Sequence, residues 1–127
     1  MKRVFHLILA AATTMTLTAC HRPTHPEAKQ QAEQRWNEVR ARVKLQLARQ
    51  QYDGGLFHDV LQSASESIAL DPTQAGAYVL LAQADLESGK PASAEQAIEA
   101  ARRAGLDSPD LHYMQGVLLE QRDDVKT

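Results

Sequence analysis

A chain of 127 residues provides one small domain with a single modest core. Its two Phe, three Tyr and one Trp are few, and Ala, Gln, Leu, Glu and Arg dominate, which favours packed helices over a β-sheet. The formal net charge of −2 gives no indication of a nucleic-acid-binding protein.

The first nineteen residues have the pattern of an export signal. Lys2 and Arg3 precede a mainly apolar stretch over residues 4–17. This stretch is shorter than the roughly 20 apolar residues of a membrane-spanning helix. The segment from Leu17 to Cys20 resembles the lipobox of bacterial lipoproteins, in which small residues precede an obligatory Cys. The resemblance implies cleavage before Cys20 and attachment of a diacylglycerol to its thiol.

The lipobox resemblance also implies a location. A lipidated Cys20 anchors the chain to a bacterial membrane with the folded part facing the periplasm. His21, not Asp, follows Cys20, and in enterobacteria-like sorting this favours the outer membrane. Two alternatives stay open, an ordinary secretory signal with an incidental Cys and an uncleaved anchor. Because Cys20 is the only cysteine, no disulfide forms within the chain.

A short tether and a long helix are predicted next. Two prolines interrupt residues 20–27, which therefore form the lipidated tether. A helix from about Glu27 to Tyr52 follows, because apolar residues recur there at three- and four-residue spacing. These residues are Ala32, Trp36, Val39, Val43 and Leu47.

The long helix lies in the basic part of the chain. Residues 21–52 carry seven Lys or Arg and three Glu, whereas residues 53–127 carry five basic and thirteen acidic residues. Five of the basic residues are predicted to lie near anionic head groups or an acidic partner: Arg22, Lys29, Arg35, Arg40 and Arg42. The alternative is a solvated helix face with mixed charges.

Four shorter helices are predicted after the long one. They cover residues 56–70, 75–88, 91–104 and 109–121. Their ends are marked by residues that favour helix termini. These are Gly54-Gly55, Asp71-Pro72, Gly89, Pro91, Gly105 and Ser108-Pro109.

A shift of 34 residues aligns similar residues in the two halves of this region. It places Ala48 on Ala82 and Gly55 on Gly89. The pattern resembles the tetratricopeptide repeat, a 34-residue helix-turn-helix unit. The resemblance implies an all-α fold of antiparallel helix-turn-helix repeats, stacked as an α-solenoid of about two and a half repeats, with a long N-terminal helix. The helical domain would cover residues 28–127, with repeats at about 41–74 and 75–108 and a partial repeat at 109–122.

The chain departs from the family pattern in four places. Lys44 stands where an aromatic is usual, although Tyr78 fills the corresponding place in the second repeat. Gln51 and Asp85 replace a usual Tyr, and Leu106 replaces the closing Pro. These departures weaken the pattern most in the first helix of the first repeat.

The repeat resemblance implies a groove lined by the first helix of each unit. An apolar groove with a few polar groups suits an extended or helical peptide, so a protein partner is expected. The residues carried over to this groove are Leu45, Arg49, Tyr52, Val79, Gln83, Leu86, Tyr113, Val117 and Glu120. The alternative is that Leu45, Val79 and Val117 are core residues.

The sequence contains no motif that indicates catalysis. It has no G-x-S-x-G, P-loop or H-E-x-x-H pattern, and its single thiol is assigned to the lipid. His21 and His25 lie in the proline-broken tether without a third ligand, so no metal site and no cofactor other than the lipid are predicted. Asp85, Glu87 and Glu99 are interpreted as a solvated helix face.

The function expected from these features is that of a lipid-anchored adaptor or assembly factor, not of an enzyme. Likeness to small repeat lipoproteins suggests pilotin-like roles or assembly of secretion, pilus or envelope machines. The alternative is a structural subunit of an envelope complex that uses its apolar last helix, through a partner or as a homodimer. A metal-binding or enzymatic lipoprotein is a distant alternative. A further alternative is that the long helix, with Trp36, folds back and covers part of the apolar surface of the last helix.

Overall fold

The computed structural model describes residues 25–124, and within this range the chain is all-α. Five helices and no strand are present there: α1 (His25–Asp53), α2 (Phe57–Leu70), α3 (Ala75–Glu87), α4 (Pro91–Arg103) and α5 (Pro109–Asp124). The predicted fold class is confirmed at this level. The predicted export signal, Cys20 and His21 lie outside the described residues.

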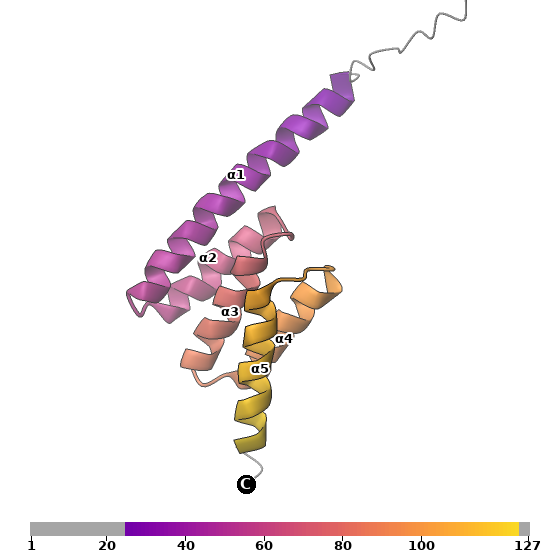
Figure 1. The fold of residues 1–127 in the computed structure, drawn as a ribbon. Helices are drawn as coiled ribbons and strands as arrows, with labels where there is room; N and C mark the ends of the chain where they lie inside the picture. Colours follow the sequence, from indigo (N-terminus) through magenta and orange to yellow (C-terminus); the bar gives the residue numbers. More distant parts are fainter. Residues whose placement is uncertain (1–24, 125–127) are drawn as a thin grey trace, which may run out of the picture.

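Helix α3 lies at the centre of the fold and packs against all four other helices. Short turns join α1 to α2 and α3 to α4, so that each pair forms a helical hairpin (Figure 1). Helix α5 packs on α3 and α4. Helix α1 is 29 residues long, and its N-terminal part extends well beyond the other helices (Figure 1).

Two helix ends 34 residues apart have the same geometry. Gly55 and Gly89 have φ of 73° and 71°, in the left-handed region where a residue with a Cβ is strained. The amide that follows each glycine donates to a carbonyl five residues earlier, from Leu56 to Gln51 and from Lys90 to Asp85, both at 2.8 Å. This Schellman arrangement ends α1 and α3 at the predicted glycines.

Local signals also set the starts of the later helices. The Asp71 carboxylate accepts hydrogen bonds from the amide and hydroxyl of Thr73 and from the side-chain amide of Gln74, which shapes the turn before α3. Ser108 caps α5, because its Oγ accepts from the Leu111 amide at 3.3 Å. These residues lie where the sequence predicted helix boundaries.

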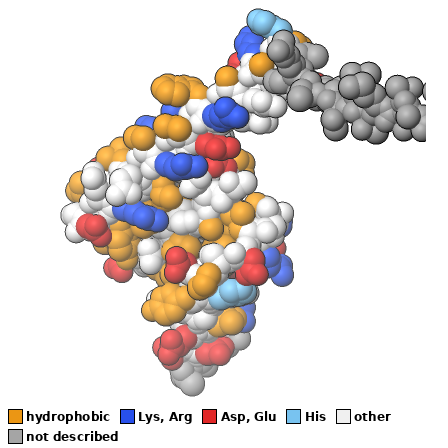
Figure 2. Space-filling model, turned by 45° about the horizontal axis from the view of Figure 1, so that its top comes forward, with side chains coloured by type: hydrophobic (Ala, Val, Ile, Leu, Met, Phe, Trp, Pro, Cys, Tyr) orange, Lys and Arg blue, Asp and Glu red, His pale blue; other side chains and the backbone are white. Residues whose placement is uncertain are grey.

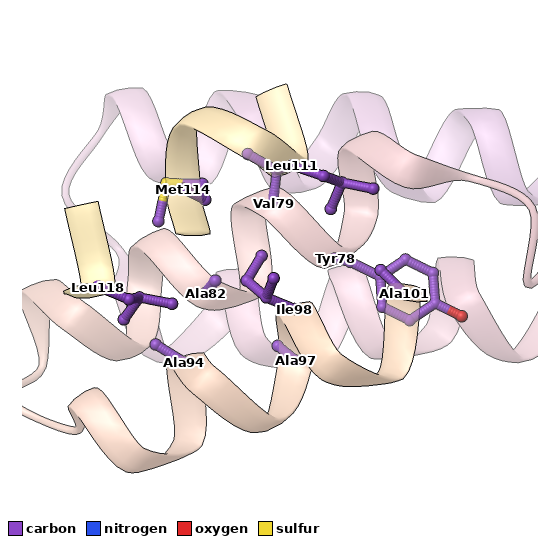
Figure 3. Close-up of a cluster of buried hydrophobic side chains, with 10 residues drawn as sticks. All are labelled: Tyr78, Val79, Ala82, Ala94, Ala97, Ile98, Ala101, Leu111, Met114 and Leu118. Carbon is purple, nitrogen blue, oxygen red and sulfur yellow. The ribbon is translucent and has the colours of Figure 1, made fainter. Parts of the chain in front are cut away.

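Two clusters of buried side chains meet at α3. One lies between α1, α2 and α3, and the other between α3, α4 and α5 (Figure 3). Small side chains without exposed surface occur in both clusters and at the α1–α2 contact: Ala41, Ala48, Ala64, Ala82, Ala94 and Ala101. Because these side chains are short, the helices can approach each other closely.

The two hairpins use different residues at places 34 positions apart. In α3, Tyr78 is buried, and its hydroxyl donates to the Pro72 carbonyl at 3.2 Å. In α1, Lys44 stands at the corresponding place, and its ammonium pairs with the Glu66 carboxylate of α2. At this place the first hairpin therefore has a partly exposed ion pair between its two helices, whereas the second hairpin has a buried aromatic ring.

The apolar stripe predicted on the long helix does not face the core. Trp36, Val39, Val43 and Leu47 are exposed, and Ala32 is exposed with them. The buried face of α1 consists of Ala41, Leu45 and Ala48. The sequence pattern emphasised the large side chains, whereas the close contact with α2 requires small ones.

Two further expectations about the long helix are wrong. Helix α1 begins at His25, so the last three residues of the predicted tether are helical. Helix α1 also does not fold back over α5, because its packing partners in the described chain are α2 and α3. Trp36 is accordingly 63% exposed.

Candidate partner-binding surface

A hollow of about 320 Å³ lies where α1, α3 and α5 come together. Five of the nine residues predicted for the groove line it: Tyr52, Gln83, Leu86, Tyr113 and Val117. Three residues that the sequence did not single out for the groove complete the lining: Glu87, Met114 and Gln121. The structure therefore brings residues that are up to 69 positions apart in the sequence to one surface.

Helical periodicity places these side chains. Gln83 and Glu87 lie four residues apart on the last turns of α3, with Leu86 beside them. On α5, Val117 and Gln121 are also four apart, and Tyr113 is four residues before Val117. Tyr52 comes from the last turn of α1. Helices α3 and α5 therefore each contribute a short stripe to the hollow, and α1 contributes one side chain.

The hollow has an apolar floor and a mixed rim. Met114 is buried and belongs to the cluster beneath the hollow, while Leu86 and Val117 are half-buried. Tyr113 is 70% exposed, the highest fraction among the large hydrophobic side chains of the described residues. Glu87 is the only acidic or basic residue among the lining residues.

Tyr52 is held at the edge of the hollow by a neighbouring ring. Its ring centroid lies 5.6 Å from that of Phe57, with an angle of 60° between the ring planes. Partial burial raises the pKa of Tyr52, and the negative charges of Glu87 and Asp53 raise it further. The phenol therefore stays protonated at neutral pH and can donate a hydrogen bond to a ligand.

Four of the predicted groove residues lie elsewhere. Leu45 and Val79 are buried in the core, each 8% exposed, so the core interpretation holds for these two and not for Val117. Arg49 and Glu120 are exposed but do not line the hollow. The Arg49 guanidinium lies over Gly76 at the start of α3, where an added Cβ would be 3.3 Å from its Nη2.

The three additional lining residues had a weak signal in the sequence. Met114 and Gln121 lie three residues before and four residues after Val117, which is helical spacing for one face. Glu87 lies four residues after Gln83, but the sequence alone predicts it on a solvated face. It is exposed, and at the same time it lines the hollow.

A second hollow, of about 530 Å³, lies between α4 and α5 on another side of α5. Its lining includes Ile98, Leu118 and Leu119, and Leu119 is 47% exposed. Gly116 lies one turn from Leu119, and an added Cβ there would meet no atom within 4 Å. Helix α5 therefore has uncovered apolar surface at Leu119 and Tyr113, although its Met114 and Leu118 are buried.

The predicted solvated acidic face is only partly correct. Asp85 is 7% exposed, and burial raises the pKa of its carboxyl, an effect that the charge of Lys90 opposes. Helix α3 is central, so side chains on several of its sides are buried. Glu99 is half-buried and pairs with Arg102 at 2.9 Å.

Residues 25–124 contain no group of three or more His, Cys, Asp or Glu side chains arranged to hold a metal ion. Among the same residues, no helix combines the length and apolar character needed to cross a membrane.

No protein-family model, curated protein or solved structure matches the chain.

Proposed function

We propose that this protein is a lipid-anchored adaptor or assembly factor that faces the bacterial periplasm and binds a segment of a partner protein. The observation that carries the proposal is the gathering of Tyr52, Leu86, Tyr113 and Val117 from three helices around one hollow. A concave surface with an apolar floor and a few polar groups suits a peptide segment. The proposal includes no chemical step.

We also propose a tetratricopeptide-like arrangement of the helices, which two observations support. The turns at Gly55 and Gly89 are 34 residues apart and share one geometry. Helix α3 packs on both α1 and α2, and α5 packs on both α3 and α4, as neighbouring units do in stacked helix pairs. We assign the repeats to residues 41–74 and 75–108, with a partial repeat at 109–122.

The charge at the hollow suggests the chemistry of the partner segment. Glu87 lines the hollow, and its charge and that of Asp53 act on the Tyr52 phenol. A segment with an apolar or aromatic anchor beside a Lys or Arg would complement this surface. We therefore propose a partner with that combination.

The lipid anchor rests on the sequence, because Cys20 lies outside the described residues. Fatty-acid labelling in cells tests it directly: the parent chain should take up label, and Cys20→Ala should not. Label that persists in the variant would place the lipid elsewhere and remove the anchor from the proposal.

A second candidate function has its own observation. The hollow between α4 and α5, with the exposed Leu119 and the uncovered Gly116, offers a surface for permanent assembly. On this basis the protein would be a structural subunit of an envelope complex, or a homodimer through α5.

Site-specific photocrosslinking in intact cells separates the two candidates. A photoreactive amino acid at Tyr113 reports on the first hollow, and one at Leu119 reports on the second. Asp59, exposed on α2, is the control position. The adaptor function predicts a crosslinked product from Tyr113 that Leu86→Ala weakens, with none from Asp59.

The alternative outcomes of the same experiment are distinct. A product from Leu119 alone would favour the structural-subunit function, and its mass would identify a homodimer. Products of equal intensity from Tyr113 and Asp59 would contradict a specific site at the first hollow.

A further inference from the structure

The exposed stripe on α1 is an apolar feature that the proposed function does not use. Trp36, Val39, Val43 and Leu47 are 63%, 49%, 63% and 40% exposed. Their spacing of three and four residues places them on one face of a continuous helix. This face lies opposite the core face of Ala41, Leu45 and Ala48. Helix α1 is therefore apolar on two sides, and only one of them is packed.

Basic side chains border this stripe on both sides. Helical geometry places Arg35 and Arg42, seven residues apart, along one edge, and Arg40 along the other. All three are exposed. Arg42 has a neighbouring carboxylate, Glu38, at 3.9 Å, whereas Arg35 and Arg40 form no salt bridge within residues 25–124. Figure 2 shows hydrophobic and Lys or Arg side chains next to one another along the projecting helix.

The stripe is also close to the proposed lipid attachment in the chain. Five residue steps separate Cys20 from His25, the first residue of α1. They span at most about 18 Å, whatever their conformation. Trp36 follows about 16 Å further along the helix axis. A lipid on Cys20 therefore keeps the stripe within reach of the bilayer surface.

We infer that α1 is a second membrane contact, whose stripe of Trp36, Val39, Val43 and Leu47 lies in the interface of an anionic bilayer. This inference rests on the proposed lipid anchor at Cys20. The exposed face of α1 shares with interfacial helices the combination of Trp and aliphatic side chains with Arg beside them. Indole rings prefer the head-group level, and arginine side chains meet the anionic head groups there.

The charges argue against a second copy of this chain as the occupant. Pairing two α1 stripes would bring the Arg35, Arg40 and Arg42 borders of both copies together, with like charges opposed. Four side chains on one helix also form a smaller patch than the roughly 800 Å² per partner of a standard interface. An anionic surface complements the same charges.

Contact of α1 with the bilayer would also orient the proposed binding site. Helix α1 is about 44 Å long, and Tyr52 at its far end belongs to the first hollow. With the stripe on the membrane, the opposite face of α1 carries the other helices away from the bilayer. The partner would then meet a site held at a set height and direction instead of one on a free tether.

The single tryptophan makes the inference directly measurable, because its emission reports on the stripe alone. The chain from residue 20 with Cys20→Ser retains every described helix and carries no lipid. It is mixed with phosphatidylcholine vesicles, with and without phosphatidylglycerol. We expect a blue shift of the Trp36 emission with the anionic vesicles, and at least about tenfold weaker binding to the neutral vesicles or at high salt.

Variants assign the binding to the stripe and its borders. Val43→Asp places a charge on the stripe and should weaken binding to anionic vesicles at least about tenfold. The Arg35→Gln, Arg40→Gln double variant removes positive charge from the borders and should also weaken binding to these vesicles at least about tenfold. Leu119→Asp is the matched control, because Leu119 is an exposed apolar side chain on α5, at 47% against 63% for Val43, and it should bind like the parent. Circular dichroism should be unchanged, because Val43 is not packed in the core.

Several results would overturn the inference. These are an unchanged emission with anionic vesicles, equal binding to neutral ones, or normal binding by Val43→Asp. An emission shift that depends on protein concentration without vesicles would identify a second copy as the occupant. The assay uses an unlipidated chain, so a negative result leaves the anchor intact. Absence of fatty-acid label on the parent chain overturns the anchor itself.

Discussion

The Ser67 hydroxyl donates a hydrogen bond of 2.8 Å to the main-chain oxygen of Ala41. The two residues lie 26 positions apart, on α2 and α1, and neither has exposed surface. A side chain that reaches the backbone of the neighbouring helix requires a close crossing, which Ala41 allows because its side chain is one methyl group. This contact holds the first hairpin together at the point where α1 begins to project.

Substitution of Ser67 tests this contact. Ser67→Ala removes the hydrogen bond and should lower the free energy of unfolding by about 1 kcal/mol, while Ser67→Leu should cost about 1 to 3 kcal/mol through overpacking. Ser65 is the matched control, because its hydroxyl is exposed and bonds to Leu61 of its own helix at 2.6 Å. Ser65→Ala should change stability by less than about 0.5 kcal/mol in urea titrations. Equal losses at both positions would contradict a special role for Ser67.

The second hairpin depends on small residues in the same way. Ala82 of α3 and Ala94 of α4 are fully buried in the cluster of Figure 3. Ala82→Leu or Ala94→Leu should each lower the free energy of unfolding by about 1 to 3 kcal/mol. Glu87→Ala, on an exposed position, should cost less than about 0.5 kcal/mol. Thermal unfolding of the three variants is the measurement, and equal melting temperatures would contradict close packing at these alanines.

The turn before α3 should make stability depend on pH. Burial alone would raise the pKa of the Asp71 carboxyl, but hydrogen bonds from Thr73 and Gln74 outweigh it, so the pKa is lowered. In the unfolded chain the pKa of an Asp carboxyl is about 3.9. Because the pKa is lower in the folded protein, the ionised Asp71 carboxylate stabilises the fold at pH values above about 3.9. This stabilisation is lost as the pH falls through the folded-state pKa.

Asp71→Asn removes the charge that these donors bind. At pH 7 the variant should be less stable than the parent by about 1 kcal/mol. The difference should shrink as pH falls below about 3.9, because the parent carboxyl becomes protonated there as well. Melting temperatures of the parent and the variant, measured from about pH 7 to below about 3.9, show whether the stability difference shrinks. A gap that widens at low pH would be inconsistent with the hydrogen bonds to the ionised carboxylate.

If the partner binds at the first hollow, substitutions there should reduce the affinity for it more than substitutions on the N-terminal part of α1. Tyr113→Ala and Leu86→Ala should weaken binding of the photocrosslinked partner about 5- to 150-fold with unchanged helicity, because they remove apolar anchors. Arg35→Ala and Arg40→Ala, on the far part of α1, should leave the affinity of a soluble chain without Cys20 almost unchanged. Their effect should be confined to salt dependence and association rate. The opposite order in calorimetric titrations would move the site to the N-terminal helix.

Local sequence signals determined the helices themselves. Gly55, Gly89, Pro91 and Ser108 predicted the ends of elements to within a few residues, because helix termination and capping depend on neighbours in the chain. The resemblance to the tetratricopeptide repeat pointed to Tyr52, Gln83, Leu86, Tyr113 and Val117, which line one hollow.

Only the tertiary structure decided which faces are covered. The sequence shows two apolar faces on α1, and packing with α2 selected Ala41, Leu45 and Ala48 over Trp36 and Val43. It also placed Leu45 and Val79 in the core and buried the Asp85 carboxyl on the central helix. Periodicity records that a face is apolar, but burial depends on the distance at which another helix can approach. That distance is set by side chains far away in the sequence, so it emerges only when the helices pack.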